Sequence, residues 1–459
     1  MPETIQAYLE AVREQIRWKR ARPVLARELE RHLEDQRDEF LKEGKSPEEA
    51  ERLAVEDMGD PVTVGMELDA VHRPRPQWGL LGLTLTLALA GAILRVVFHQ
   101  SYHASPARLL VKSLAALGLG TVAMLGMYIF DVSRLVRHAK TVYIGALAAG
   151  ALTLTLHRAA VSYYTRYVVL LYPIAYALWL YSFRGKGWRG LLLSILGRVP
   201  LALICSMAPS TTGLLLLWFS GLVLTLLAAW QDWFGVGKWK STGVTLAVAL
   251  SAPAVLISQG YLHSFRQRLQ IALHPELDPK GQGFFGWILR IFWAEVPPLR
   301  QHGSAGAAVN AGARIRICVD STHVPEKAMP IDFSHDFLPA SMAVAWGWIP
   351  LLVLVAALTA LFVWILVKGL RQTYLPGRFV VLAAVITLAA QLVLSTALNL
   401  GFVLFSASLP LVVGNLQTVL DMALIGLTLS VFRGESITRE EPDAPPLPRR
   451  RLRIRLEYQ

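Results

Sequence analysis

The sequence predicts an all-α membrane protein that crosses the bilayer several times. Hydrophobic residues make up 54% of the 459-residue chain, and its mean hydropathy is +0.43. Several apolar runs approach the roughly 20 residues that a helix needs to span about 30 Å of hydrocarbon. These runs are continuously apolar, as in residues 351–358, whereas the strands of a membrane β-barrel alternate apolar and polar residues. We therefore expect a polytopic helical protein rather than a soluble or β-barrel fold.

Residues 1–77 precede the first apolar run and are predicted to form a small helical domain. Apolar residues at helical spacing in 5–16 give one face, and a second face follows Pro23, which a first helical turn tolerates. Residues 46–49 match a capping box for a third helix, and Gly59-Asp60-Pro61 is expected to end it and begin a fourth. Because no cleavable signal peptide is expected, we place this domain in the cytoplasm.

Ten spans are expected in a membrane domain of residues 78–435. Basic residues gather after the even-numbered spans, so the positive-inside rule places those connections and both termini in the cytoplasm. The long polar loop 258–340 is then extracytoplasmic. Arg158 and Arg166 are exceptions, because they lie on a predicted outer turn. The expected spans are 78–99, 108–132, 141–157, 166–183, 189–208, 212–231, 242–259, 341–367, 377–400 and 409–432.

The formal charge of +12 comes from the membrane loops and from a basic cytoplasmic tail, residues 436–459. Clustered arginines in this tail are expected to contact anionic lipids. We predict no nucleic-acid partner, because no aromatic-basic module is present. Cys205 and Cys318 provide neither a disulfide framework nor a metal site. The histidines follow no metal-ligand spacing, so no metal site is predicted.

Two resemblances to known families follow from short motifs. Residues 1–77 contain the motifs Glu28-Leu29-Glu30-Arg31-His32-Leu33-Glu34-Asp35-Gln36, Met58-Gly59-Asp60-Pro61 and His72-Arg73-Pro74. In this order they resemble the permease-prefix regulatory domain that precedes some bacterial membrane proteins, although a hairpin that only packs on the membrane domain is the alternative. The membrane part contains the motifs Tyr128-Ile129-Phe130-Asp131, Arg266-Gln267-Arg268-Leu269, Pro275-Glu276-Leu277-Asp278-Pro279, Gly281-Gln282-Gly283-Phe284, Val324-Pro325-Glu326, His335-Asp336-Phe337 and Asn399-Leu400-Gly401. In this order they resemble the SEDS family of bacterial cell-shape, division and sporulation proteins.

The SEDS resemblance implies a peptidoglycan glycosyltransferase that polymerises lipid II at the outer membrane face of a bacterium. It also implies a class B penicillin-binding protein as partner and a divalent cation arriving with the lipid diphosphate. Asp336 matches the family's essential aspartate and is the predicted catalytic base or electrostatic organiser, with Asp332 as the alternative acid. Asp336 can instead cap the eighth span. The residues expected to bind substrate are Arg266, Arg268, Asp278, Arg300, Glu326 and Asn399.

Other interpretations remain open for these residues and for the whole chain. Arginines that flank a span can anchor it to lipid head groups, and Glu326 can be a solvated loop residue. The polar residues within spans, Asp131, Gln391, Asn399, Gln417 and Asp421, can act in function or in interhelical hydrogen bonds. The family's Ser-Tyr-Gly-Gly-Ser signature is replaced by residues 409–415, which favours a non-catalytic lipid-binding scaffold. A lipid-linked sugar transporter is the third hypothesis.

Overall fold

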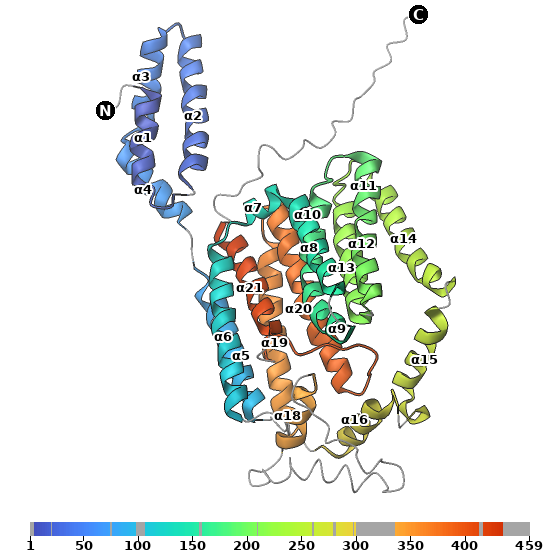
Figure 1. Cartoon of the computed structure of the whole chain (residues 1–459). Helices are drawn as coiled ribbons and strands as arrows, with labels where there is room; N and C mark the ends of the chain where they lie inside the picture. Colours follow the sequence, from blue (N-terminus) through green and yellow to red (C-terminus); the bar gives the residue numbers. More distant parts are fainter. Residues whose placement is uncertain are drawn as a thin grey trace, which may run out of the picture. The chain divides into compact units, whose positions relative to one another are not determined.

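The protein is described by a computed structural model, in which the regular elements of the described residues are all helices (Figure 1). The chain divides into two compact units, whose main parts are Met1–Gln77 and Trp78–Val431. The description excludes residues 1–3, 20, 74–75, 98–105, 156–157, 209, 259–260, 279–280, 297, 300–335, 413–415 and 435–459.

The first unit consists of four helices, α1 (Ile5–Gln15), α2 (Arg22–Lys42), α3 (Pro47–Met58) and α4 (Pro61–His72). The predicted apolar faces form its core, which includes the fully buried side chains of Tyr8, Val12 and Leu33. The helix-end signals are also confirmed. Ser46 accepts a hydrogen bond from the Glu49 N–H at 3.3 Å, and Asp60 caps α4 by accepting from the Thr63 N–H at 3.0 Å.

The second unit is a bundle with helices at all ten predicted spans. Seven helices among the described residues are long and apolar enough to cross a membrane. Its helices are α5 (Trp78–Val97), α6 (Pro106–Ile129), α7 (Val132–Arg137), α8 (Ala139–Leu154), α9 (Arg158–Val168), α10 (Tyr172–Tyr181), α11 (Gly187–Leu196), α12 (Arg198–Met207), α13 (Thr211–Trp230), α14 (Lys238–Ser258), α15 (Tyr261–Leu273), α16 (Phe284–Glu295), α18 (Leu338–Trp346), α19 (Trp348–Leu370), α20 (Leu375–Asn399) and α21 (Leu416–Gly434).

Three predicted spans are interrupted in the structure. The fourth begins earlier than expected, at Arg158, and passes through a 3₁₀ turn between α9 and α10. The fifth divides into α11 and α12 at Gly197. The eighth divides into α18 and α19 at Gly347, whose φ of +94° favours glycine. A side chain at this position would also meet the carbonyl oxygen of Pro298. Glycine therefore permits the break that follows α18.

Two further boundaries differ from the sequence expectation. The predicted outer loop begins with two helices, α15 and α16, because its first third carries apolar residues at helical spacing. The tenth span was expected from residue 409, but α21 begins at Leu416. Residues 400–412 instead form an irregular connecting segment between α20 and α21. This connecting segment contains side chains that complete the site described below.

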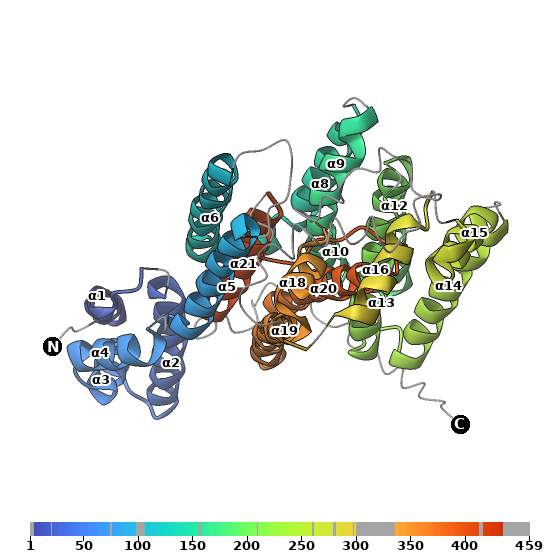
Figure 2. The ribbon, with the colours of Figure 1, turned by 90° about the horizontal axis from the view of Figure 1, so that it is seen from below.

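Helices α20 and α21 lie at the centre of the bundle. Their most apolar windows are 67% and 72% buried, against 22% for α6 at the periphery. In Figure 2, α20 is surrounded by α10, α13, α18 and α19. Polar residues on these two helices, including Gln391 and Asp421, are therefore enclosed by protein and need internal hydrogen-bond partners.

Candidate functional site

The carboxylate of Asp336 is held by side chains from two other parts of the chain. Arg166 on α9 donates from Nη2 to Oδ1 at 2.8 Å. From the connecting segment, the Ser406 hydroxyl donates to Oδ2 at 3.2 Å, and the Ser408 hydroxyl donates to Oδ1. The N-cap of α18 is Phe337, which makes no side-chain cap. The alternative prediction that Asp336 caps this span is therefore wrong for the observed arrangement.

Arg166 and Asp336 form a partly buried ion pair. Their side chains are 29% and 19% exposed, so solvent screens this pair less than a surface salt bridge. Arg166 also donates to the Ser408 hydroxyl at 2.8 Å, and its guanidinium lies 5.8 Å from the centre of the Tyr167 ring. Arginine, serine and aspartate thus form one hydrogen-bonded cluster, which fixes the position of the carboxylate.

The cluster keeps Asp336 ionised. Burial raises the pKa of its carboxyl group, but the charge of Arg166 and the hydrogen bonds from Arg166, Ser408 and Ser406 outweigh burial and hold the pKa below its ordinary value. At neutral pH the group is a carboxylate with a low affinity for protons. It can stabilise positive charge in this state, and it becomes a stronger base if Arg166 is drawn away.

Asn399 at the end of α20 positions the backbone around Asp336. Its amide nitrogen donates to the Asp336 carbonyl oxygen at 2.9 Å, and its amide oxygen accepts from the Ala340 N–H at 3.0 Å. The residue is only 2% exposed. Its side chain thus makes interhelical hydrogen bonds to α18 and to the turn before it, which is the alternative to the predicted contact with substrate.

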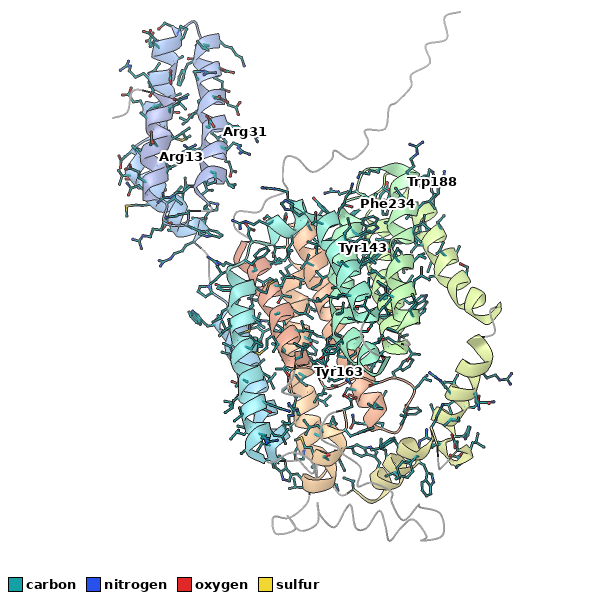
Figure 3. The ribbon with its side chains drawn as sticks, viewed as in Figure 1. Arg13, Arg31, Tyr143, Tyr163, Trp188 and Phe234 are labelled. Carbon is teal, nitrogen blue, oxygen red and sulfur yellow. The ribbon has the colours of Figure 1, made fainter. Side chains whose placement is uncertain are left out.

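A cavity of about 390 Å³ lies beside the cluster. Arg166, Ser406 and Ser408 line it, together with Tyr163 and apolar side chains from the 3₁₀ turn before α10, from α13 and from α20. In Figure 3, Tyr163 marks this part of the bundle, whereas Tyr143 lies nearer the other end. The lining combines polar and apolar side chains in similar numbers, so the cavity can position a ligand by hydrogen bonds as well as by apolar contact. The partners of Asp336, rather than Asp336 itself, form the wall of the cavity.

The structure does not bring the remaining predicted residues into this cluster. Arg266 and Arg268 are exposed on α15, and Arg268 lines a second cavity, of about 340 Å³, with residues of α16 and the connecting segment. Asp278 accepts a hydrogen bond from the Gln282 N–H at 2.9 Å and stabilises the turn before α16. The predicted residues Arg300, Glu326 and Asp332 lie outside the described residues.

The divalent cation that the resemblance implied would arrive with the lipid diphosphate, and this expectation stays a prediction. Within the described ranges, no group of three His, Cys, Asp or Glu side chains is placed to hold a metal ion. The Asp336 carboxylate is faced by the guanidinium of Arg166 at 2.8 Å. Arg166 is thus the cation that the structure places beside this carboxylate.

Sequence reasoning missed three members of the cluster, namely Arg166, Ser406 and Ser408. Arg166 did leave a signal, because a basic residue on a predicted outer turn is an exception to the positive-inside rule. Its pairing with Asp336, which is 170 positions away in the chain, explains that exception. The serines left no signal, because residues 402–408 lack a recognisable motif and resembled the approach to an apolar span.

Similarity to one solved structure identifies the fold. No protein-family model and no curated protein sequence matches the chain. A chain of a peptidoglycan synthase complex that coordinates polymerization and crosslinking aligns with a TM-score of 0.57 at 20% identity, over 78% of this chain and 98% of that one. The rod shape determining protein RodA of Thermus thermophilus aligns with a TM-score of 0.49 at 17% identity, over 78% and 97%. A mutant of that RodA gives 0.45 at 16% identity, over 78% and 98%. The chain therefore has the polytopic membrane fold of the SEDS proteins, as its sequence motifs predicted.

Proposed function

We propose that the chain is a SEDS-type glycosyltransferase that polymerises lipid II at the outer face of the bacterial cytoplasmic membrane. Its role would be cell-wall synthesis in growth, division or sporulation. The observation that carries this proposal is an ionised carboxylate, Asp336, held by Arg166 and two serines at the edge of a cavity of about 390 Å³. The similar chain from a peptidoglycan synthase complex supports the same class of reaction.

The proposed reaction needs a base and a positive charge. The 4-hydroxyl oxygen of the acceptor sugar attacks the anomeric carbon of the donor, and the bond from that carbon to the lipid diphosphate breaks. The hydroxyl proton passes to a carboxylate, which we assign to Asp336. The leaving diphosphate carries the electron pair of the broken bond, and the cation of Arg166 in the cavity wall stabilises its charge.

Arg166 has two roles that cannot be fully satisfied at once. In the resting site it bonds to Asp336 and lowers the carboxyl pKa, which makes that group a poor base. A lipid diphosphate in the cavity offers Arg166 a second anion. As Arg166 turns toward the diphosphate, Asp336 loses its positive neighbour, and its affinity for a proton rises. Substrate binding thus prepares the base for proton transfer.

The proposal also includes the orientation of the chain in the membrane and two kinds of partner, a transpeptidase and anionic lipids. With both termini in the cytoplasm, the turn that carries Asp336 lies at the outer end of the bundle. A class B penicillin-binding protein would crosslink the strands that this chain polymerises, as expected from the complex that contains the similar chain. The basic tail, residues 436–459, would contact anionic lipids at the cytoplasmic face.

The direct test is polymerisation of lipid II by the purified chain, alone and with a class B penicillin-binding protein. We expect glycan strands from the wild type and from Asp332→Asn, and a loss of about a thousandfold or more from Asp336→Asn, which keeps the shape of the side chain but not its charge. Asp131→Asn is the matched control. Asp131 caps α7 by accepting from the Ser133 N–H at 3.0 Å, at the other end of the bundle from α18 (Figure 1). Asparagine caps helices as well as aspartate.

Other outcomes separate the remaining functions. A wild-type chain that binds lipid II and its transpeptidase but forms no polymer would be the scaffold of the alternative hypothesis. Movement of lipid-linked sugar across a vesicle membrane without polymer would indicate the transporter. Either result would overturn the glycosyltransferase proposal.

A further inference from the structure

The second half of the connecting segment, residues 407–412, is buried although it is not helical. Ser408, Leu409 and Leu411 are at most 1% exposed, and Leu411 has a φ of +66°, which is uncommon for a residue other than glycine. Non-helical backbone inside a membrane bundle needs protein partners for its N–H and C=O groups. The position of this segment therefore depends on the side chains that supply those partners.

Asp421 on α21 supplies the most buried of these partners. Its Oδ2 accepts a hydrogen bond from the Leu411 N–H at 3.0 Å, and its Oδ1 accepts from the Gln391 side-chain amide of α20 at 3.0 Å. Gln417 donates to Gln391 and also to the Ser408 carbonyl oxygen at 3.1 Å. One carboxylate thus fixes the backbone near both ends of residues 408–411, directly at Leu411 and through two glutamines at Ser408.

This backbone carries one of the two serine hydroxyls that hold Asp336. Ser408 bonds to Asp336 through its side chain and to Gln417 through its carbonyl. Asp421 is fully buried and is absent from the lining of the cavity, whereas Gln391 and Gln417 line it. We propose that Asp421 is a positioning residue, which holds residues 408–411 of the connecting segment so that Ser408 stays bonded to Asp336. This role deepens the proposed function and rests on it for its effect on catalysis.

Asparagine at position 421 would break this arrangement with little change in volume. The carboxylate accepts from two donors, one at each oxygen. An asparagine amide has only one oxygen, so its NH₂ group must face either the Leu411 N–H or the Gln391 amide. Thr428→Val is the matched control, because Thr428 is also fully buried on α21 but its hydroxyl bonds within its own helix, to the Ile425 carbonyl.

Amide hydrogen exchange of the full-length protein tests the positioning role without reference to activity. In Asp421→Asn, we expect the amides of residues 404–412 to exchange about tenfold faster, as the loss of one buried hydrogen bond predicts. We expect no change in this segment for Thr428→Val. Unchanged exchange in Asp421→Asn would overturn the proposal, as would an equal acceleration in both variants.

Activity tests the connection to Asp336. We expect Asp421→Asn to lower the rate of lipid II polymerisation about tenfold in the wild-type background, but less than threefold when Ser408→Ala is already present. If Asp421→Asn lowered the polymerisation rate equally in the wild type and in Ser408→Ala, Asp421 would not act through Ser408. That result would overturn the proposed link from Asp421 to Asp336. If the wild type forms no polymer, the proposed function fails, and hydrogen exchange still decides whether Asp421 positions the segment.

Discussion

The helical unit of residues 1–77 and the cluster around Asp336 are specified in different ways. In the first unit, helices α1, α3 and α4 are each capped at their start by a side chain three positions from the N–H that it binds, such as Ser46 with Glu49 and Asp60 with Thr63. In the cluster, Arg166 and Ser408 reach Asp336 from 170 and 72 positions away. Local signals define the first region, whereas only the packing of the bundle brings the second together.

The largest effect that sharpens this comparison is expected at Arg166. Arg166→Gln removes the positive partner of Asp336 and the charge that faces the diphosphate, so we expect polymerisation at limiting lipid II to fall about 10²–10³-fold, which corresponds to about 3–4 kcal/mol. The folded structure should persist, because the pair is partly exposed. Initial rates measure the loss of polymerisation, and thermal unfolding in detergent shows whether the variant is still folded. A loss of folded protein in proportion to activity would instead indicate a purely structural ion pair.

A core substitution in the first unit should give a smaller effect of a different kind. Leu33→Ala removes a fully buried side chain from α2, and we expect it to destabilise this unit by about 3 kcal/mol. Hydrogen exchange should quicken in helices α1 to α4 and remain unchanged in α20 and α21. Val24→Ala, at an exposed position of the same helix, is the control. Faster exchange throughout the membrane unit would show that the two units unfold together.

Asn399→Ala, a substitution beside the cluster, is expected to have an intermediate effect on the rate of polymerisation. Asn399→Ala leaves the buried Ala340 N–H without its acceptor and frees the Asp336 carbonyl. We expect about a tenfold loss of polymerisation rate with little change in the concentration of lipid II at half-maximal rate. A lower rate with an unchanged half-saturating concentration of lipid II is expected of a positioning residue, and not of the substrate-binding residue that the sequence predicted. A rise in the half-saturating concentration at constant maximal rate would favour direct binding.

The smallest effect is expected at a helix cap. Ser46→Ala removes the acceptor for the Glu49 N–H at the start of α3, which should destabilise that helix by about 1 kcal/mol. Exchange of the amides in the first turn of α3 measures this loss. Because the cap acts locally, amides in α1 should exchange as before, and a change there of equal size would contradict the local account.

The same contrast explains how much could be predicted from the sequence. Apolar periodicity and caps predicted the helices of the first unit and the positions of helices at the ten expected spans, because these features depend on near neighbours. Asp336 was predicted through a motif. Its partners were not, because contacts between α9, α18 and the connecting segment depend on how helices pack. The start of the tenth span was also misplaced, since residues 409–412 are apolar yet lie outside α21.

The central claim is that Arg166 controls the protonation of Asp336, and the pH dependence of polymerisation tests it most directly. Arg166 helps to hold the carboxyl pKa of Asp336 below its ordinary value, so the ionised form, which the reaction requires, persists to lower pH in the wild type. At limiting lipid II, where the profile reports groups of the free protein, the rate of Arg166→Gln should therefore decline at a higher pH than that of the wild type. Arg134→Gln, which alters an exposed residue of α7, should retain the wild-type profile. If the polymerisation rates of the wild type and of Arg166→Gln declined at the same acidic pH, this result would contradict the account.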